Sequence, residues 1–567
     1  MLNKVKPAVG WVFLAIILLA ILLIVVNDKL LPTALHETES PSIITEITAT
    51  SSTISTDPDW WNTAVVYQIF VRSFYDSNGD GIGDFQGIIE KLDYLNDGNS
   101  ETDTDLGVTA IWLLPIYPSP SYHGYDVSDY YTVNPQYGSM EDFKQLIDEA
   151  HQRGIKVIID LVVNHSSNKI NWFQQALDVN STYHDWYLWS ENNPGYAGPW
   201  GQKVWHQASN RLYYYGVFDS SMPDLNYANE EVSNAMMDVA KYWAEEIGVD
   251  GFRIDGAKHL IEEGEIQANT ESTKDWFTEF YTQYKNWDQA LMTVGEVWEP
   301  SIIASTYIKK QCFDMVFNFD LSTAIISKVI LGDGQGIATK IISEDNRFRN
   351  GGMATFLTNH DMNRVMSQFT GDVDLAKHAA TILLTMPGTP FIYYGEEIGM
   401  VGAKPDELIR TPMQWSSAKG AGFSVGQPWE APNANFTDYN VLDQSTDPES
   451  LLSLYRPLIA IRLKHPALLD GDYHIARTDE KSIYAAVRVK DQDVILTIVN
   501  VKDKIINDPS FEVSGGLPAG EYLATILFGS QGSNFDLVIN EVEDAFQFTL
   551  PFAVQGHDNL VIELTKQ

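Results

Sequence analysis

Cysteine is almost absent from this chain of 567 residues, in which Cys312 is the sole example. A single cysteine cannot form an intramolecular disulfide, so the chain is not a disulfide-stapled scaffold, and its cysteine content does not indicate a redox compartment. We expect Cys312 to be a buried, inert thiol.

Basic residues are scarce as well. The chain has 37 Lys and Arg against 76 Asp and Glu, which gives a formal net charge of −39. Such a surface repels nucleic acid, because nucleic-acid binding depends on Lys and Arg contacts to phosphate. The charge suits a neutral substrate, or a salty environment that screens self-repulsion. The length exceeds one ordinary domain and allows a large core with additional domains.

The chain has one long hydrophobic run. Residues 8–26 carry no charge and follow Lys4 and Lys6. As a helix this run is about 28 Å long, close to the ~30 Å hydrocarbon core of a bilayer. We therefore predict a transmembrane signal anchor at 8–26, a cytoplasmic segment at 1–7 and a flexible linker at 27–58. The protein would then be held by the membrane on its extracellular face. The alternative is a signal peptide that is cleaved before secretion.

From residue 59 onwards, apolar segments alternate with helical patterns. The predicted strands lie at 65–74, 108–116, 155–163, 252–254, 292–297, 315–319, 353–357 and 391–394. Predicted helices include the one that follows a capping-box pattern at Ser139–Asp142 and ends at Gly154. Alternating strands and helices predict a parallel sheet, and eight strands predict a (β/α)₈ barrel formed by 59–165 and 223–466.

Two regions depart from this alternation. Residues 166–222 are rich in Trp, Tyr and Asn and are too many for a structureless loop, so they predict a small domain inserted after the third strand. Residues 467–567 contain β-rich segments separated by glycine-containing turns, and they predict a C-terminal antiparallel β-sandwich. The predicted fold class is thus α/β, with a TIM barrel, an inserted domain, a C-terminal β domain and an N-terminal transmembrane helix.

Polar residues follow several predicted barrel strands, at the barrel end where catalytic residues of this fold lie. Arg253 and Asp255 are two positions apart, so on a strand they point to the same side. An arginine beside a carboxylate favours the ionised form that a nucleophile needs. Glu296 ends the next strand with no cation adjacent in sequence, so desolvation can keep it protonated.

Paired carboxylates without a thiol or a Ser–His pair favour glycosidic chemistry. On this hypothesis Asp255 is the nucleophile, Glu296 is the acid, and Asp361 holds sugar hydroxyls. His165 and His360 can donate hydrogen bonds to hydroxyl groups. A structural ion pair is the competing interpretation for any one of these carboxylates.

Four ordered motifs carry a family resemblance: DLVVNH, GFRIDGAKH, GEVW and FLTNHD, ending at His165, His259, Trp298 and Asp361. Together they resemble the α-amylase family, glycoside hydrolase family 13. The resemblance implies Asp255 as nucleophile, Glu296 as acid/base and Asp361 as transition-state stabiliser. It also implies that Tyr125 stacks on the sugar in the cleaved subsite, which His165, Arg253 and His360 line.

The resemblance extends to the bond that is cut. Lys258 and His259 resemble the pair that contacts the leaving-group side in α-1,4-acting α-amylases. The MPDLN stretch at 222–226 and the RTPMQW stretch at 410–415 resemble the group between oligo-1,6-glucosidases and neopullulanases. We expect cleavage of α-1,4 bonds in starch and maltooligosaccharides. The alternatives are a neopullulanase or oligo-1,6-glucosidase-like preference, transfer to a sugar acceptor, and a non-catalytic amylase-like membrane partner.

Alternating oxygen-bearing positions predict a Ca²⁺ site. The pattern resembles the start of an EF-hand loop without its closing Glu, and it lacks soft ligands. The predicted ligand positions are Asp76, Asn78, Asp80, Ile82 and Asp84. The family resemblance implies Ca²⁺ in this loop and a second Ca²⁺ site that could use Asn164 and the carbonyl of His259. The sequence does not identify the carboxylate that the inserted domain would supply to the second site.

Overall fold

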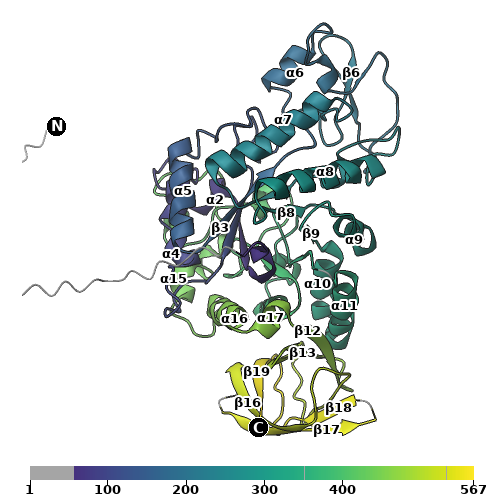
Figure 1. The fold of residues 1–567 in the computed structure, drawn as a ribbon. Helices are drawn as coiled ribbons and strands as arrows, with labels where there is room; N and C mark the ends of the chain where they lie inside the picture. The colour runs from purple at the N-terminus through teal and green to yellow at the C-terminus, as the bar shows by residue number, and fades with distance from the viewer. Residues whose placement is uncertain (1–56, 350, 532, 544) are drawn as a thin grey trace, which may run out of the picture. The chain divides into compact units, whose positions relative to one another are not determined.

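A computed structural model describes residues 57–567, except 350, 532 and 544. All of the described residues belong to one compact unit of the chain, which spans 52–567. Figure 1 shows the path of the chain through the barrel, the inserted domain and the C-terminal β domain.

The predicted membrane anchor is not upheld. Within the described residues, no helix is both long enough and apolar enough to cross a membrane. The hydrophobic run at 8–26, on which the prediction of a transmembrane helix and a membrane-bound extracellular location rested, lies outside those residues. The prediction rested on the hydrophobicity and length of the run and on Lys4 and Lys6 before it, and we withdraw both the helix and the location.

Eight parallel strands close into a barrel, as predicted. Their order around the barrel is β1-β11-β10-β9-β8-β7-β3-β2. The strands are β1 (Val66–Ile69), β2 (Ala110–Leu113), β3 (Lys156–Leu161), β7 (Gly251–Ile254), β8 (Met292–Gly295), β9 (Met315–Phe317), β10 (Met353–Phe356) and β11 (Thr389–Tyr393). Nearly all of their residues are buried, which explains why their sequences read as continuous apolar runs. The first strand is shorter than predicted, because the chain enters the buried helix α2 (Val71–Phe74) directly after it.

Helices surround the barrel (Figure 1). The longer ones are α5 (Met140–Gln152), α7 (Glu230–Lys241), α8 (Glu271–Trp287), α9 (Ser301–Lys309), α10 (Phe319–Leu331), α11 (Gly334–Arg347), α13 (Val373–Thr385) and α16 (Leu452–Lys464). Shorter ones are α2 (Val71–Phe74), α3 (Phe85–Ile89), α4 (Leu92–Leu95), α12 (Val365–Gln368), α14 (Asp406–Ile409), α15 (Val441–Gln444) and α17 (Pro466–Asp470). The predicted capping box is present at α5, where Ser139 and Asp142 satisfy each other's backbone N–H groups.

The segment between β3 and α7 contains a small antiparallel sheet with the strand order β4-β6-β5. Its elements are α6 (Asn171–Ala176), β4 (Trp189–Ser190), β5 (Trp205–Gln207) and β6 (Tyr213–Tyr215). A single β-bridge from His165 to Asp224 joins its two ends, and another ties Tyr187, within the segment, to Leu225. This segment therefore leaves the barrel and returns to it at the same place, above the C-terminal ends of the strands.

The C-terminal domain is antiparallel, but its strands form a closed ring rather than two separate sheets. The order is β12-β13-β14-β19-β16-β17-β18-β15. The strands are β12 (Asp472–Arg477), β13 (Ile483–Lys490), β14 (Asp493–Asn500), β15 (Ser510–Val513), β16 (Gly520–Phe528), β17 (Phe535–Val542), β18 (Ala545–Thr549) and β19 (Asn559–Lys566). The predicted sandwich is wrong in this respect, because β12 pairs with both β13 and β15 and thereby closes the ring.

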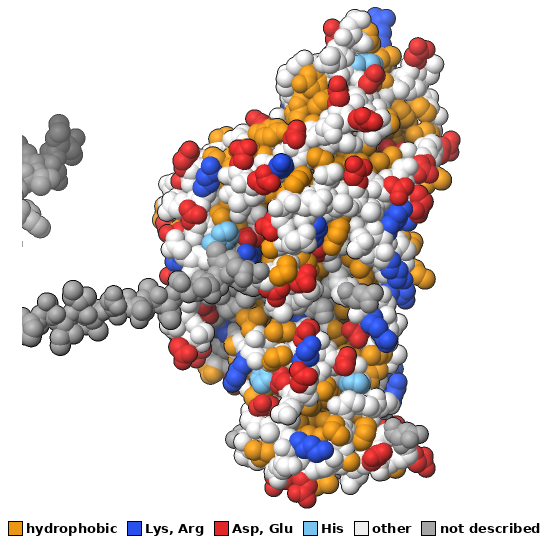
Figure 2. Space-filling model, in the orientation of Figure 1, with side chains coloured by type: hydrophobic (Ala, Val, Ile, Leu, Met, Phe, Trp, Pro, Cys, Tyr) orange, Lys and Arg blue, Asp and Glu red, His pale blue; other side chains and the backbone are white. Residues whose placement is uncertain are grey.

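The acidic composition is visible at the surface. On the face drawn in Figure 2, acidic side chains are spread over the barrel, the inserted domain and the C-terminal domain, and basic side chains are fewer. The charge is thus distributed over that face instead of forming one anionic patch.

Candidate active site

A cavity of about 680 Å³ contains the predicted site residues. Its lining comprises His123, Tyr125, His165, Trp200, Phe218, Met222, Asp255, Gly256, Lys258, His259, Glu296, Trp298, Asp361, Lys404, Asp406 and Arg410. Seven of the nine predicted catalytic and substrate-binding residues are in this lining. The other two, Arg253 and His360, are buried behind it and contact residues that do line it.

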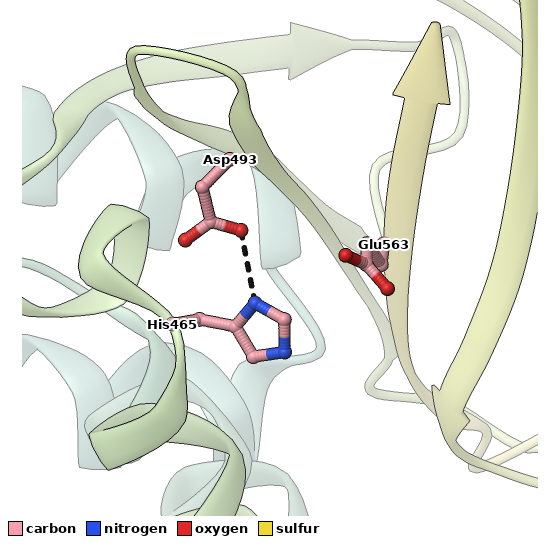
Figure 3. Close-up of side chains that lie close together, drawn as sticks. All are labelled: His465, Asp493 and Glu563. Carbon is pink, nitrogen blue, oxygen red and sulfur yellow. Dashed lines mark hydrogen bonds and ion pairs between the residues drawn. The ribbon is translucent and has the colours of Figure 1, made fainter. Parts of the chain in front are cut away.

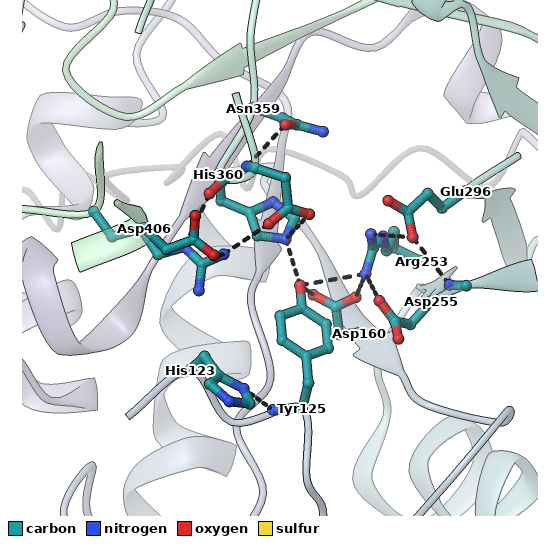
Figure 4. Close-up of polar contacts among 12 residues, drawn as sticks. His123, Tyr125, Asp160, Arg253, Asp255, Glu296, Asn359, His360 and Asp406 are labelled. Atoms are coloured by element: carbon teal, nitrogen blue, oxygen red, sulfur yellow. Dashed lines mark hydrogen bonds and ion pairs between the residues drawn. The ribbon is translucent and has the colours of Figure 1, made fainter. Parts of the chain in front are cut away.

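Arg253 is the centre of the site (Figure 4). Its Nη1 atom lies 2.6 Å from Asp160 Oδ1 and 2.7 Å from Asp255 Oδ1, and its Nη2 atom lies 2.9 Å from Glu296 Oε2. The guanidinium is 1% exposed. One cation therefore contacts three carboxyl groups from three neighbouring strands, β3, β7 and β8.

This arrangement corrects part of the expectation drawn from the sequence. Arg253 contacts Glu296 as well as Asp255, so a nearby cation does not by itself distinguish the nucleophile from the acid. Burial raises the pKa of Glu296 to about 7, and the negative charges of Asp255 and Asp361 also raise it, whereas Arg253 opposes the rise. Burial raises the pKa of Asp255 too, again against the effect of Arg253. Near neutral pH, Glu296 thus retains a proton that it can donate.

The turn after β7 brings the carboxyl groups of Asp255 and Glu296 together. The backbone N–H of Gly256 donates to Glu296 Oε2 at 2.9 Å. Gly256 has a φ of +53°, and a Cβ atom at this position would lie 2.9 Å from the ring of Phe218. Both the backbone conformation and the packing therefore require glycine immediately after Asp255.

Asp361 lies in a different charge environment. Its Oδ1 accepts a hydrogen bond from Arg410 Nη2 at 2.7 Å, and its Oδ2 is 3.3 Å from His360 Nε2. Burial alone would raise the pKa of Asp361, but the positive charges of Arg410 and Arg253 lower it well below its ordinary value. Asp361 is accordingly ionised at all pH values at which the protein would work.

Tyr125 and His360 connect the two groups of carboxylates. Their rings stack with centroids 5.7 Å apart, and the Tyr125 hydroxyl is 2.6 Å from His360 Nε2. Gln68 Nε2 donates to His360 Nδ1 at 2.7 Å, so Nε2 carries the proton of the neutral ring. Burial lowers the pKa of His360 well below its ordinary value. The Nε2–H of a neutral His360 is thus within hydrogen-bond distance of the Tyr125 hydroxyl, which it can hold in place.

His165, Lys258 and His259 complete the predicted set. His165 Nε2 lies 3.2 Å from the Tyr125 carbonyl, and burial lowers the pKa of His165 to about 4. Lys258 Nζ donates to the carbonyl of Trp298 and to Glu299, at 2.8 Å each. His259 Nδ1 is 2.7 Å from the carbonyl of Gln267.

The chain was compared with known proteins. Residues 68–471 match the family model described as "Alpha amylase, catalytic domain". The chain belongs to the α-amylase family. It is therefore an α-amylase-type glycoside hydrolase of family 13.

Named relatives span most of this α-amylase-family chain. The protein named alpha-amylase 3 from Dictyoglomus thermophilum is 40% identical over 459 residues, covering 80% of this chain and 87% of its own. A probable oligo-1,6-glucosidase 2 from Bacillus subtilis is 34% identical over 521 residues, covering 78% of this chain and 90% of its own. The crystal structure of an alpha-amylase from H.orenii superimposes with a TM-score of 0.77 at 41% identity, covering 89% of this chain and 100% of that one.

Several residues of the site in this α-amylase-family protein were not predicted from the sequence. Asp160 and the RTPMQW motif of Arg410 were visible in the sequence, but no role could be assigned to them. Lys404, Asp406 and Trp200 had no signal at all, since their chain segments carry no strand pattern. Lys404 and Trp200 reach the cavity from loops, and Asp406 reaches it from the first residue of α14; only the fold determines the paths of these segments.

The predicted Ca²⁺ loop at 76–84 folds tightly on itself. Asp76 accepts hydrogen bonds from the N–H groups of Asn78, Gly79 and Gly81. Asp84 accepts them from Gly87 N, from Ser77 N and Oγ, and from Asn78 Nδ2. Asp76 and Asp84 are both 4% exposed, and burial raises the pKa of Asp84. Neither has an ion-pair partner among the described residues. A donor set that contains only oxygen atoms, with two buried carboxylates lacking a cation, fits Ca²⁺.

A second group of buried oxygen atoms fits the other implied Ca²⁺ site. Asn164 Oδ1, Asp224 Oδ2 and Glu262 Oε1 are buried and have no hydrogen-bond partner in the described part of the chain. Burial and the charge of Glu262 raise the pKa of Asp224 well above its ordinary value. Asp224, in the MPDLN stretch, and Glu262 are the two carboxyl groups that accompany Asn164 in this group.

A third acidic group is explained without a metal. His465, Asp493 and Glu563 bring ligand atoms within 4.8 Å of one another (Figure 3). Asp493 Oδ1 is 2.9 Å from His465 Nδ1, and its Oδ2 accepts from Ala467 N at the start of α17. Asp493 is thus already used to hold the first turn of that helix. In the described part of the chain, these three residues are the one group of Asp, Glu, His or Cys side chains whose possible ligand atoms all lie within 4.8 Å of one another. The carboxylates of the 76–84 loop lie farther apart than that.

Proposed function

We propose that this protein is a retaining α-glucan hydrolase that cleaves α-1,4 bonds of maltooligosaccharides and starch. The observation that carries the proposal is the attachment of Asp255 and Glu296 to the single guanidinium of Arg253, at the mouth of a barrel, with Asp361 across the same cavity. A glycosidase of this type needs one ionised carboxylate and one protonated carboxylic acid flanking the bond.

In the proposed reaction, Asp255 attacks the anomeric carbon while Glu296 donates its proton to the glycosidic oxygen. The bond from the anomeric carbon to that oxygen breaks, and the leaving sugar departs with the proton. A glycosyl ester of Asp255 remains. Glu296, now a carboxylate, takes a proton from water, whose oxygen attacks the anomeric carbon and releases Asp255.

Other residues of the cavity bind the substrate in this proposal. Asp361 holds sugar hydroxyls, and these bonds strengthen as the ring flattens towards the transition state. The Nε2–H of His360 holds the Tyr125 hydroxyl in place. Tyr125 lies under the sugar ring, and His165 supports Tyr125 by donating to its carbonyl. Lys258 and His259 face the leaving-group side.

The charges of the cavity favour a neutral substrate over a phosphorylated one. Each of its three Lys and Arg side chains is paired with a carboxylate: Lys258 with Glu299, Lys404 with Asp406, and Arg410 with Asp361 and Asp406. Among the described residues, no cation of the lining is left for a phosphate group, and four carboxyl groups line the same space. A glucan carries no charge and incurs no repulsion there.

An α-1,6 preference is the second candidate function. It is favoured by the 34% identity to a protein named as a probable oligo-1,6-glucosidase. Transfer to a sugar instead of water would use the same glycosyl ester. A product profile on starch, maltotriose, pullulan and isomaltose separates these activities, since α-1,6 cleavage would release glucose from isomaltose.

We further propose that Ca²⁺ is held by the 76–84 loop and between Asn164, Asp224 and Glu262. In the loop the ligand positions would be Asp76, Asn78, Asp80, Ile82 and Asp84. The ion would supply positive charge to buried carboxylates and fix the segments that carry them. It has no part in bond cleavage.

The test of the function is Glu296→Gln. The variant keeps the shape of the side chain and should lose 10²- to 10⁴-fold of its reducing-sugar release from maltotriose, the usual contribution of a general acid. Glu299→Gln is the matched control, since Glu299 contacts Lys258 and not the reacting bond. Undiminished activity of Glu296→Gln would contradict the assignment.

A further inference from the structure

We infer that Ser73 is a positioning residue for the reaction: its buried hydroxyl holds the backbone of Arg410 and thereby fixes the carboxylate of Asp361. The inference rests on the proposed function, in which Asp361 holds sugar hydroxyls. Ser73 belongs to none of the motifs that carry the family resemblance, and it does not line the cavity.

The backbone around Arg410 has no regular structure that could satisfy its carbonyl groups. Helix α14 ends at Ile409, and none of Ile409, Arg410 and Thr411 is more than 3% exposed. Buried carbonyl groups outside helices and sheets need side-chain donors. Three buried hydroxyls supply them: Tyr393 donates to Ile409 O at 2.9 Å, Ser73 to Arg410 O at 2.5 Å and Tyr394 to Thr411 O at 2.7 Å. Arg410 is thus the middle one of three consecutive residues whose backbone a hydroxyl holds.

Ser73 holds this segment through two hydrogen bonds. It lies in α2, which follows the first barrel strand, and it is completely buried. Its hydroxyl donates to the carbonyl of Arg410, and its own carbonyl accepts from Met413 N at 2.7 Å. Of the three hydroxyls, that of Ser73 is the one that bonds Arg410 itself, so its loss leaves the Arg410 carbonyl buried without this donor.

Trp429 directs the hydroxyl of Ser73. Its indole N–H donates to Ser73 Oγ at 3.0 Å. An indole N–H can only donate, so Ser73 accepts from Trp429 and keeps its own proton for the carbonyl of Arg410. Trp429 is itself fixed, because its backbone N–H donates to the Gly81 carbonyl at 2.8 Å and its ring stacks on Tyr122 with centroids 5.3 Å apart.

The side chain of Arg410 carries this restraint into the cavity. Its Nε atom donates to the carbonyl of His360 at 2.9 Å, and its Nη2 atom donates to Asp361 Oδ1 at 2.7 Å. The Asp361 side chain is 29% exposed and lines the cavity. A displaced Arg410 would therefore move the carboxylate whose bonds to the sugar tighten in the transition state. The loss of an interaction made in the transition state lowers kcat and leaves KM unchanged.

The experiment is a double-mutant cycle of Ser73→Ala and Arg410→Ala, measured on maltotriose or isomaltose, whichever the wild type cleaves. Ser73→Ala should lower kcat about tenfold with KM within about twofold, because a small displacement of a group that holds the transition state slows the reaction. In the Arg410→Ala background, Ser73→Ala should lower kcat less than about twofold, since the side chain through which Ser73 acts is already absent.

Two further variants complete the design. Thr389→Val is the matched control, because Thr389 Oγ1 donates to the carbonyl of Trp61 at 2.8 Å, a buried bond of the same kind at the start of β11 and so at the opposite end of the barrel. It should lower the melting temperature without changing kcat. Trp429→Phe keeps an aromatic ring and loses the indole N–H. It should lower kcat about threefold, again only while Arg410 is present, and it takes the place of Ser73→Ala if that variant does not melt cooperatively.

The cycle separates a positioning role from a structural one. An equal fall of kcat in both backgrounds would show that Ser73 supports the fold independently of Arg410, and it would overturn the inference while the proposed function stands. An unchanged kcat of Ser73→Ala would do the same. A wild type that cleaves neither substrate would overturn the proposed function, and the inference with it.

Discussion

The pKa of Glu296 gives a quantitative prediction for the pH dependence of the reaction. Burial raises this pKa from its ordinary value of 4.5 to about 7, which corresponds to about 3 kcal/mol against ionisation. The acid works only while protonated. Therefore kcat/KM for maltotriose should be constant just below pH 7 and fall about tenfold per pH unit above it, because kcat/KM reports groups of the free enzyme.

The assay needs a substrate that does not require the acid. Fluoride leaves without a proton, so kcat/KM for α-maltosyl fluoride should lack the alkaline limb seen with maltotriose. Glu299→Gln should keep the limb at the same pH, since Glu299 pairs with Lys258 and does not contact Glu296 in the described structure. An alkaline limb of equal position and slope for both substrates would refute the assignment of the limb to Glu296.

Three further predictions concern neighbouring groups. Arg410→Ala removes the 2.7 Å hydrogen bond to Asp361. It should lower kcat/KM for maltotriose about 10- to 100-fold, as expected for one hydrogen bond to a charged group. An effect below twofold would contradict the role given to Asp361. A chelator should lower the melting temperature, and added Ca²⁺ should restore it. Asp80→Ala should reduce this response. A melting temperature that changes with neither the chelator nor Ca²⁺ would count against Ca²⁺ in the loop. Burial raises the pKa of Glu396 to about 8, so the folded state holds a proton that the unfolded state loses above about pH 4.5. This contribution makes the free energy of unfolding fall as pH rises from about 4.5 to 8, and Glu396→Gln should flatten the fall seen by denaturant titration.

Much of the fold could be predicted because its pattern is local. The eight barrel strands are short and buried on both faces, so each reads as an apolar run between helical segments. The closure of the C-terminal strands into a ring was not predictable in this way. It depends on the pairing of β12 with β15, two strands that are not consecutive in the chain.

The candidate site was predictable where it depends on one strand and not where it depends on two. The alternation along β7 correctly places Arg253 and Asp255 on one side. The contact of Arg253 with Glu296 depends on the register of β7 against β8, in which Arg253 pairs with Val294 and Ile254 with Gly295. Sequence spacing carries no information about that register. The same applies to Trp200 and Arg410, which loops bring to the cavity from distant parts of the chain.

The number of charges around Arg253 explains why one acid of the site stays protonated. Asp160, Asp255 and Glu296 share one guanidinium, whereas Asp361 has Arg410 beside it. Three buried carboxylates on one cation would leave two uncompensated negative charges in a desolvated space, which burial strongly disfavours. The pKa values of all three are raised accordingly, those of Asp160 and Glu296 to about 7. A retained proton is therefore a consequence of three acids meeting one arginine, and Glu296 is the member with a raised pKa of about 7 that also faces the cavity.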